Sequence, residues 1–305
     1  MGHMERKDRI DAFGAISLTG FSLILAFNQV VIAVVNEGLQ PVFFAGLRSL
    51  GALLCMLLWF RLRRRPVALD LADIRPGLLI GSLFAIEFVF LFIALDLTTV
   101  TRVSVIFYTM PLWLALMAHF AIPGERMTAI KSAGLVAAFV GVAIAIFWRD
   151  SGGEAEDQAS IVGDFFALLA ALSWAGIALV ARTGLAHVAP DRQLIWQLGV
   201  SAGLLLIVAP LFGPLVRDFV PAHLAGLAFQ IVVVATFGYA FWLWLLSIYP
   251  APSVAAFSFL TPGMGVLLGW ALLGEPVGLP ILFALGLVCA GLMLINRPAQ
   301  VPQNV

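Results

Sequence analysis

Charged side chains are scarce in this sequence, at 11% of residues, whereas hydrophobic residues make up 62%. Soluble domains carry about a quarter charged residues, so this composition excludes an ordinary soluble fold. The formal net charge is zero, which gives no overall field that would attract nucleic acid. The composition therefore predicts an all-α integral membrane protein.

Cysteine is also rare. Cys55 and Cys289 lie in two separate apolar runs, where small buried hydrophobic residues are more usual than a disulfide or a metal pair. The sequence has no Walker A loop, no HExxH and no GxSxG, the local signatures of nucleotide hydrolysis, zinc proteolysis and acyl transfer. We therefore expect no enzymatic activity, no cofactor, no metal and no ATP hydrolysis by this chain.

Long apolar runs dominate what is present. A spanning helix needs about 20 mostly apolar residues, and ten such runs follow one another, five on each side of the acidic stretch 149–160. The sequence predicts a cytoplasmic N-terminal segment 1–10 that includes a cloning remnant, a first repeat 11–148, an external linker 149–160, a second repeat 161–296 and a cytoplasmic tail 297–305. The predicted helices are 11–34, 41–60, 74–96, 101–121, 128–148, 161–182, 192–213, 223–247, 253–273 and 278–296.

Basic residues favour alternate connections between these runs. With the N-terminus inside, the inner segments hold Arg6, Lys7, Arg9, Arg61, Arg63, Arg64, Arg65, Arg75, Arg126, Lys131, Arg182, Arg192 and Arg297, and the outer segments hold Arg102, Arg149 and Arg217. Cytoplasmic loops of membrane proteins are enriched in Lys and Arg. This asymmetry predicts a multi-pass protein of the cytoplasmic membrane with both termini in the cytoplasm.

The two halves also share faint similarities at a nearly constant spacing of 150–153 residues. Five helices in the first half would place the second half in the opposite orientation, so we expect an inverted repeat. Each Gly-Glu pair closes a run that contains a proline. The matching positions are Asp11 and Asp164, Gly134 and Gly286, Gly124-Glu125 and Gly274-Glu275, and Pro111 and Pro262.

Five helices per half, a proline within the run and Gly-Glu at its end resemble the EamA-type repeats of the drug/metabolite transporter superfamily. The resemblance covers residues 11–296, and within the superfamily it is greatest to amino-acid exporters. It implies that helices 1–4 and 6–9 surround a central cavity, with helices 5 and 10 outside. It further implies export of aromatic and other neutral amino acids, with Trp174 in the sixth helix as a wall or gate of the cavity.

Charges inside the apolar runs are the strongest functional candidates, since each costs about 2.5–3.5 kcal/mol to insert. Arg48 and Glu87 lie at similar depth in the second and third runs, which predicts a salt bridge between them. The pair could only lock the two helices together. Alternatively, Arg48 could bind a substrate carboxylate, and Glu87 could bind an ammonium group or carry a proton.

Aromatic and polar residues surround these charges in the predicted helices. Phe84 and Phe88 share a helical face with Glu87, which suits either helix packing or a pocket for an amphipathic solute. Asn28, Tyr108 and Ser173 could contact substrate, or bond only to neighbouring helices. Pro111 and Pro262 are candidate hinges, because each proline frees a carbonyl within its run.

These observations predict a secondary transporter that exports amino acids or related metabolites by alternating access. The alternative is a multidrug or nucleotide-sugar-like carrier of the same superfamily, with or without proton coupling. The expected partners are a small-molecule substrate and the lipid bilayer, with no nucleic acid. The GxxxG spacings at Gly77/Gly81, Gly199/Gly203 and Gly265/Gly269 are attributed to packing within the chain, so a monomer is favoured over a dimer.

Overall fold

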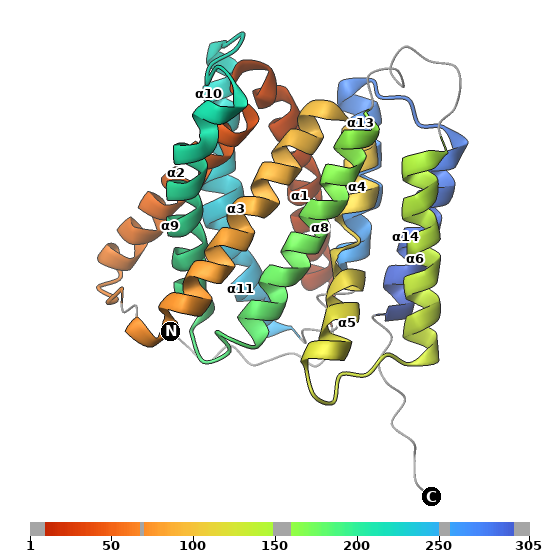
Figure 1. The fold of residues 1–305 in the computed structure, drawn as a ribbon, viewed down its shortest axis with the longest axis horizontal. Coiled ribbons are helices and arrows are strands. Elements are labelled where there is room, and N and C mark those ends of the chain that lie inside the picture. Colours follow the sequence, from red (N-terminus) through yellow and green to blue (C-terminus); the bar gives the residue numbers. More distant parts are fainter. Residues whose placement is uncertain (1–9, 68–69, 149–159, 250–256, 296–305) are drawn as a thin grey trace, which may run out of the picture.

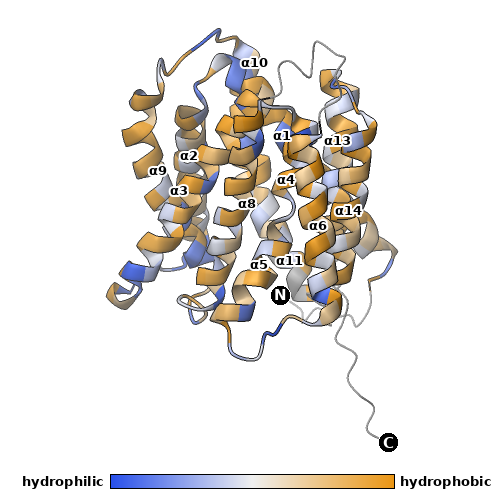
Figure 2. Cartoon of the chain, turned by 45° about the vertical axis from the view of Figure 1, so that its right-hand side comes forward, coloured by the Kyte–Doolittle hydropathy of each residue, from blue (hydrophilic) through white to orange (hydrophobic). Residues whose placement is uncertain are grey.

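The computed structural model describes residues 10–67, 70–148, 160–249 and 257–295. In these ranges the helices stand side by side along one direction (Figure 1), and hydrophobic residues cover the sides of the bundle (Figure 2). We call the face where α1 begins and α14 ends the proximal face, and the opposite face the distal face. The linker stretch 149–159, the terminal segments 1–9 and 296–305, and the start of the predicted ninth helix lie outside the described residues.

The first half packs mainly against helices of the second half, and its own successive helices contact one another less. Its elements are α1 (Ala12–Gly38), α2 (Pro41–Leu62), the 3₁₀ turn η1 (Leu71–Asp73), α3 (Ile74–Leu97), α4 (Val100–Phe107), α5 (Met110–Ala121) and α6 (Ala129–Phe147). The second half contains α8 (Ile161–Arg182), α9 (Pro190–Val208), η2 (Ala209–Phe212), α10 (Pro221–Ala228), η3 (Phe229–Gly238), α11 (Tyr239–Ile248), η4 (Phe257–Phe259), α13 (Leu260–Leu273) and α14 (Leu279–Ile295).

Within the described residues, 8 helices are long and apolar enough to cross a membrane, counting the paired segments 71–97, 100–121, 190–212 and 221–242 as single spans. α13 and α14 are apolar but shorter, with 14 and 17 residues. The described residues thus show eight of the ten expected spans at full length, and the crossing of the membrane by α13 and α14 stays a prediction.

Local sequence sets where several helices begin. The side chains of Asp11, Thr99, Thr128 and Ser160 accept hydrogen bonds from backbone amides in the first turns of α1, α4, α6 and α8, which satisfies donors that the helix itself leaves free. Pro41, Pro190 and Pro221 occupy the first turns of α2, α9 and α10, where a missing amide costs nothing.

Small residues allow close packing at two helix pairs. α6 lies along α14, and a Cβ atom added at Gly291 would overlap the carbonyl oxygen of Gly134. α3 packs against α8 and α9, and Gly77 and Gly81 lie directly against Trp196 of α9. The first of the predicted GxxxG spacings therefore serves contacts within the chain, whereas Gly203 has open space beside it.

Two spans depart from regular α-helix. The span 100–121 breaks between α4 and α5 at Tyr108 and Thr109, with Pro111 in the first turn of α5. Pro262 lies in the first turn of α13. In the second half, η3 is a π-helix of 10 residues between α10 and α11, a rare form that is frequent at functional sites. Pro111 thus follows a break in its span, whereas Pro262 follows the change from the 3₁₀ turn η4 to α13.

Candidate functional site

Six polar side chains from five spans meet inside the bundle, and we call them the central polar group: Asn28, Gln29, Arg48, Glu87, Ser104 and Gln230. Arg48, Glu87 and Gln230 are 6%, 5% and 0% exposed. They lie 7–10 residues from the distal ends of α2, α3 and α10, or about 10–15 Å deep at 1.5 Å per residue. Polar groups at this depth in a membrane bundle mark functional sites by default.

Arg48 is held from two sides. Its Nε donates to Oε1 of Gln230 at 3.1 Å, and its guanidinium lies 4.3 Å from the centre of the Phe88 ring. Gln230 in turn donates from Nε2 to the backbone oxygen of Asn28 at 3.1 Å. One buried glutamine therefore connects α1, α2 and the start of the π-helix.

The predicted salt bridge between Arg48 and Glu87 is not formed. Their charges interact electrostatically, but among the described residues no Glu87 oxygen comes within the 4.0 Å of an ion pair. α3 presents Phe88 to the guanidinium, and successive residues of a helix point about 100° apart. Gln230, and not Glu87, accepts the hydrogen bond from Nε of Arg48.

Gln29, which follows Asn28 on α1, makes a second contact within the central polar group. Ser104 donates from Oγ to Oε1 of Gln29 in a short hydrogen bond. A Cβ atom added at Gly265 of α13 would overlap the Ser104 hydroxyl, so glycine at that position lets α13 approach α4 closely. The central polar group is thus enclosed by helices of both halves.

Several buried atoms in this region have no hydrogen-bond partner among the described residues. They are Asn28 Oδ1, Gln29 Nε2, Arg48 Nη1, Ser49 Oγ and Glu87 Oε2. Buried polar atoms in native proteins nearly always have a partner, and each exception requires an explanation. The set includes cationic and anionic atoms as well as neutral ones, so it is chemically suited to a ligand that carries both charges.

Aromatic rings line two sides of this region. Phe107 stacks on Trp174 with ring centres 5.0 Å apart, and Tyr108 meets the same indole at 6.3 Å. Tyr108 also donates to the backbone oxygen of Leu25 at 3.1 Å, one turn of α1 before Asn28. On α3, Phe84 and Phe88 are edge to face at 4.5 Å.

The structure brings most of the predicted site residues together around residues 25–29 of α1. Ser173 is an exception in its bonding, since its hydroxyl donates to the Leu169 carbonyl of its own helix at 2.8 Å. Gln230, Gln29 and Ser104 are recognisable in the sequence only as isolated polar residues in apolar runs, and their partners on distant helices are not recognisable there.

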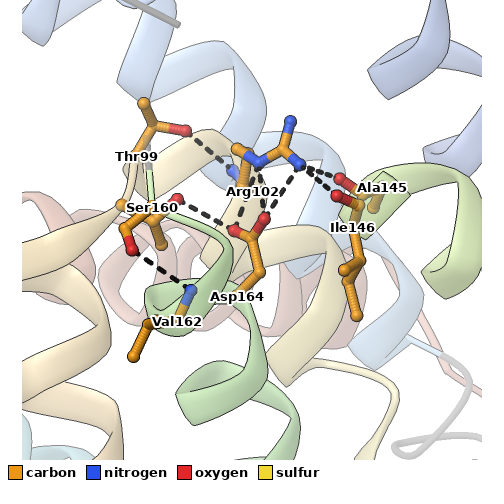
Figure 3. A network of polar contacts seen from close by, with 8 residues as sticks. Thr99, Arg102, Ala145, Ile146, Ser160, Val162 and Asp164 are labelled. Atoms are coloured by element: carbon orange, nitrogen blue, oxygen red, sulfur yellow. Dashed lines mark hydrogen bonds and ion pairs between the residues drawn. The ribbon is translucent and has the colours of Figure 1, made fainter. Parts of the chain in front are cut away.

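A buried ion pair near the distal face was not predicted from the sequence. The guanidinium of Arg102 donates to both carboxylate oxygens of Asp164 at 2.9–3.1 Å and to the backbone of Ala145, while Thr98 adds a bond to the carboxylate at 2.8 Å (Figure 3). Sequence position assigned Arg102 to an external loop. In the structure α4 begins at Val100, so Arg102 lies in its first turn and points inward.

The described residues hold no group of three or more His, Cys, Asp or Glu that could bind a metal ion. A groove of about 550 Å³ runs along α6, lined by Phe139, Val140, Ala143, Ile144, Phe147 and Trp148. Phe139 and Phe147 are strongly exposed there. Because its lining is apolar, this groove suits lipid rather than a polar solute.

Comparisons with known proteins agree with this architecture. The EamA-like transporter family matches the chain twice, at residues 12–147 and 161–297. The "Uncharacterized transporter YoaV" of Bacillus subtilis (strain 168) is 24% identical over 284 residues, covering 92% of this chain and 94% of that protein. "Uncharacterized transporter YvbV" of the same organism is 28% identical over 268 residues, covering 85% and 84%.

A protein of known crystal structure has the same fold, with a TM-score of 0.63 and 21% identity over 92% of this chain and 98% of that one. The two family matches together span nearly all of the described helices. The chain is therefore a membrane protein built from two copies of one helical unit, and it belongs to the EamA-like transporter family.

Proposed function

We propose that this protein is a secondary transporter that exports neutral and aromatic amino acids across the cytoplasmic membrane by alternating access. In this proposal ten helices form two inverted repeats around a central cavity, and both termini are cytoplasmic. The proximal face is then the cytoplasmic face, and the distal face is external. The sequence resemblance to the amino-acid exporter YddG supports the choice of substrate.

The observation that carries the proposal is the pair of unpartnered charged atoms, Arg48 Nη1 and Glu87 Oε2. An amino acid carries a carboxylate and an ammonium group, so one molecule could satisfy both. Arg48 would bind the carboxylate through its free Nη1 while Gln230 holds Nε, since a guanidinium has donors in several directions. Glu87 would accept from the ammonium group.

The surrounding residues suit the rest of an amino acid. Phe84, Phe88, Tyr108 and Trp174 offer ring faces and edges to an apolar or aromatic side chain, a favourable contact for aromatic groups. Asn28 has a free amide oxygen near Gln230. Ser173 lies next to Trp174 in the chain and completes the proposed lining. Pro111 and Pro262, each in the first turn of its helix, are the proposed hinges.

A second candidate function is transport of organic cations or nucleotide-like solutes. Glu87 Oε2 without a partner and the stacked Phe107 and Trp174 rings would also suit a flat cation. Arg48 would repel an organic cation, so its loss should increase the transport of cations. A nucleotide-like solute carries phosphate, which Arg48 would attract, so loss of Arg48 should lower its transport.

The test is uptake by proteoliposomes of the purified protein. Labelled phenylalanine and threonine are compared with phenylalaninamide, which lacks the carboxylate, and phenylpropionate, which lacks the ammonium group. We expect saturable flux of the two amino acids and at least about tenfold less of each analogue, since an unpaired buried charge costs more than about 1.4 kcal/mol. Arg48→Gln should remove the preference for phenylalanine over its amide, whereas Arg48→Lys keeps part of it.

An imposed pH gradient tests energy coupling in the same vesicles. Flux down the gradient of the metabolite needs no coupling ion, so we expect the gradient to leave it unchanged. Acceleration by the gradient that disappears in Glu87→Gln would instead identify Glu87 as a proton carrier. Absence of flux for every amino acid from well-folded protein would exclude the proposed substrates, and cationic drugs and nucleosides would then be tested.

A further inference from the structure

Two arginines at equivalent places of the two repeats close opposite faces of the bundle. Arg65 and Arg217 are 152 positions apart, which is the spacing that relates the halves. Arg65 follows α2 at the proximal face, and Arg217 precedes α10 at the distal face (Figure 1). Each one bonds to helices of the other repeat, Arg217 to α1 and α3 and Arg65 to α9.

The distal contact, which we call the distal latch, consists of several bonds. Arg217 donates to both carboxylate oxygens of Asp96 at the end of α3, at 2.6 and 3.0 Å, and to the backbone oxygen of Asn36 at 3.0 Å. Its own amide donates to Gly38 at 3.0 Å. This bidentate geometry is the strong form of an arginine–carboxylate contact.

Backbone pairing reinforces the distal latch. Leu39 and Val216 form an antiparallel bridge, and the amide of Gln40 donates to the Leu215 oxygen at 3.0 Å. The connection 213–220 is therefore fastened over the turn between α1 and α2. Any path from the central polar group to the distal face between these helices has to part this contact.

The proximal contact, the proximal latch, is weaker. Arg65 Nη1 lies 3.3 Å from one oxygen of Asp191, in the first turn of α9, and the Arg65 side chain is 58% exposed. Its guanidinium also lies 5.6 Å from the Trp59 ring. An exposed single ion pair contributes little to stability, so the described structure is closed more firmly at its distal face.

We propose that Arg217 with Asp96 forms the distal gate of the transport cycle, and that Arg65 with Asp191 is its counterpart at the proximal face. Alternating access requires the central polar group to face one side at a time. The two latches therefore open in turn. Breaking one latch shifts the population toward the state that is open at the face which the intact latch closes. This inference rests on the proposed transport function, but not on the identity of the substrate.

A disulfide across the bridge tests whether the distal latch opens. Leu39 and Val216 are a non-hydrogen-bonded antiparallel pair, as the flanking bonds 217→38 and 40→215 show. Such pairs have Cα atoms about 4.5 Å apart, within the range of about 4.4–6.8 Å that disulfides accept. The variant Leu39→Cys/Val216→Cys is made in a Cys55→Ser/Cys289→Ser background, with each single cysteine as control.

We expect oxidation to lower flux at least about tenfold, and reduction to restore it, because a crosslinked latch excludes the distal-open state. The reduced protein shows that the variant folds. Undiminished flux through protein shown to be crosslinked would overturn the proposal.

A second arm measures access without any substrate. A membrane-impermeant maleimide is applied to each side of oriented vesicles that contain Asn28→Cys, a reporter in the central polar group. Arg217→Gln should raise labelling from the distal side several-fold, because loss of the distal latch favours the state that is open at the distal face. Arg65→Gln should in the same way raise labelling from the proximal side. Equal labelling of the parent and both variants would overturn the proposal.

If Arg217→Gln fails to fold, Asp96→Asn takes its place, since it weakens the same contact and should also raise distal labelling. The exchanged pair Asp96→Arg/Arg217→Asp is the control that should label like the parent. Because this arm needs no transported solute, it separates the two proposals. Absent amino-acid flux with side-specific labelling would reject the substrate and support the latches. Normal flux with unchanged labelling would reject the latches alone.

Discussion

Arg102 and Asp164 form an ion pair that is almost wholly shielded from solvent, with side chains 4% and 0% exposed. The guanidinium meets both carboxylate oxygens and also the backbone at the end of α6. Three helices, α4, α6 and α8, are thereby joined at the distal face (Figure 3). The pair lies away from the central polar group, so we assign it to stability rather than to substrate binding.

Removing one partner of this pair should be strongly destabilising. We expect Asp164→Asn to lower the free energy of unfolding by about 3–5 kcal/mol, because it leaves the Arg102 charge buried without its counter-ion. Unfolding in detergent, followed by helical circular dichroism, measures the change. Glu125→Gln is the control, since its ion pair with Arg182 has side chains that are 41% and 45% exposed, and it should cost under about 1 kcal/mol. The apolar pair Arg102→Met/Asp164→Leu should be more stable than either single variant.

Gln230 should act as a positioning residue for Arg48. Gln230→Leu frees Nε of Arg48 and removes the bond to α1, so we expect the half-saturating concentration of phenylalanine to rise about tenfold, with a smaller change for phenylalaninamide. Uptake kinetics in proteoliposomes measure both. The matched control is Thr236→Val in the same π-helix, whose hydroxyl bonds only to its own helix at Ile231. An equal effect on both substrates would mean that Gln230 has a general structural role.

Trp174 should contribute to affinity for aromatic side chains. Its stacked partner Phe107 and its neighbour Tyr108 place the indole in an aromatic cluster, and an aromatic pair is worth about 0.5–1.5 kcal/mol beyond its area. We expect Trp174→Ala to weaken phenylalanine binding about 2–10-fold more than threonine binding, and Trp174→Phe to preserve most of it. Trp270→Ala is the control, because that indole is 59% exposed on the side of the bundle. Unchanged phenylalanine affinity in Trp174→Ala would remove this residue from the site.

The distal latch should be insensitive to alkaline pH. The hydrogen bonds that Arg217 donates to the Asp96 carboxylate raise the pKa of Arg217 above its ordinary value. A group whose pKa is raised on folding contributes stability at every pH below its unfolded pKa and loses it only as pH rises through the folded pKa. The difference in Tm between the parent and Arg217→Gln should therefore be the same at about pH 7 and about pH 9. A difference that shrinks by pH 9 would show that another group controls the latch.

Sequence patterns were informative wherever a property depends on residues close together in the chain. The apolar runs 41–60 and 161–182 placed the starts of α2 at Pro41 and of α8 at Ile161. The apolar runs located the spans, and the repeat spacing paired equivalent positions. The family match to residues 12–147 and 161–297 agrees with the division into two repeats.

Patterns failed where a property depends on how helices face one another. Arg48 and Glu87 are level in depth, yet α3 turns Phe88 toward the guanidinium and Gln230 arrives from a distant helix. A shift of one residue on a helix rotates a side chain by about 100°, which exceeds the accuracy of any inference from depth alone. The π-helix that carries Gln230 has no recognisable sequence signal either.

The sequence by itself determined that this is a two-repeat helical membrane protein with rare buried charges, because hydrophobic length and local capping depend on neighbours in the chain. Tertiary structure alone decided which charges are paired. It paired Arg102 with Asp164 and Arg217 with Asp96, and it left Arg48 Nη1 and Glu87 Oε2 without partners among the described residues. The physical reason is that ion pairing needs atoms within about 4 Å, and only the packing of distant helices sets distances on that scale.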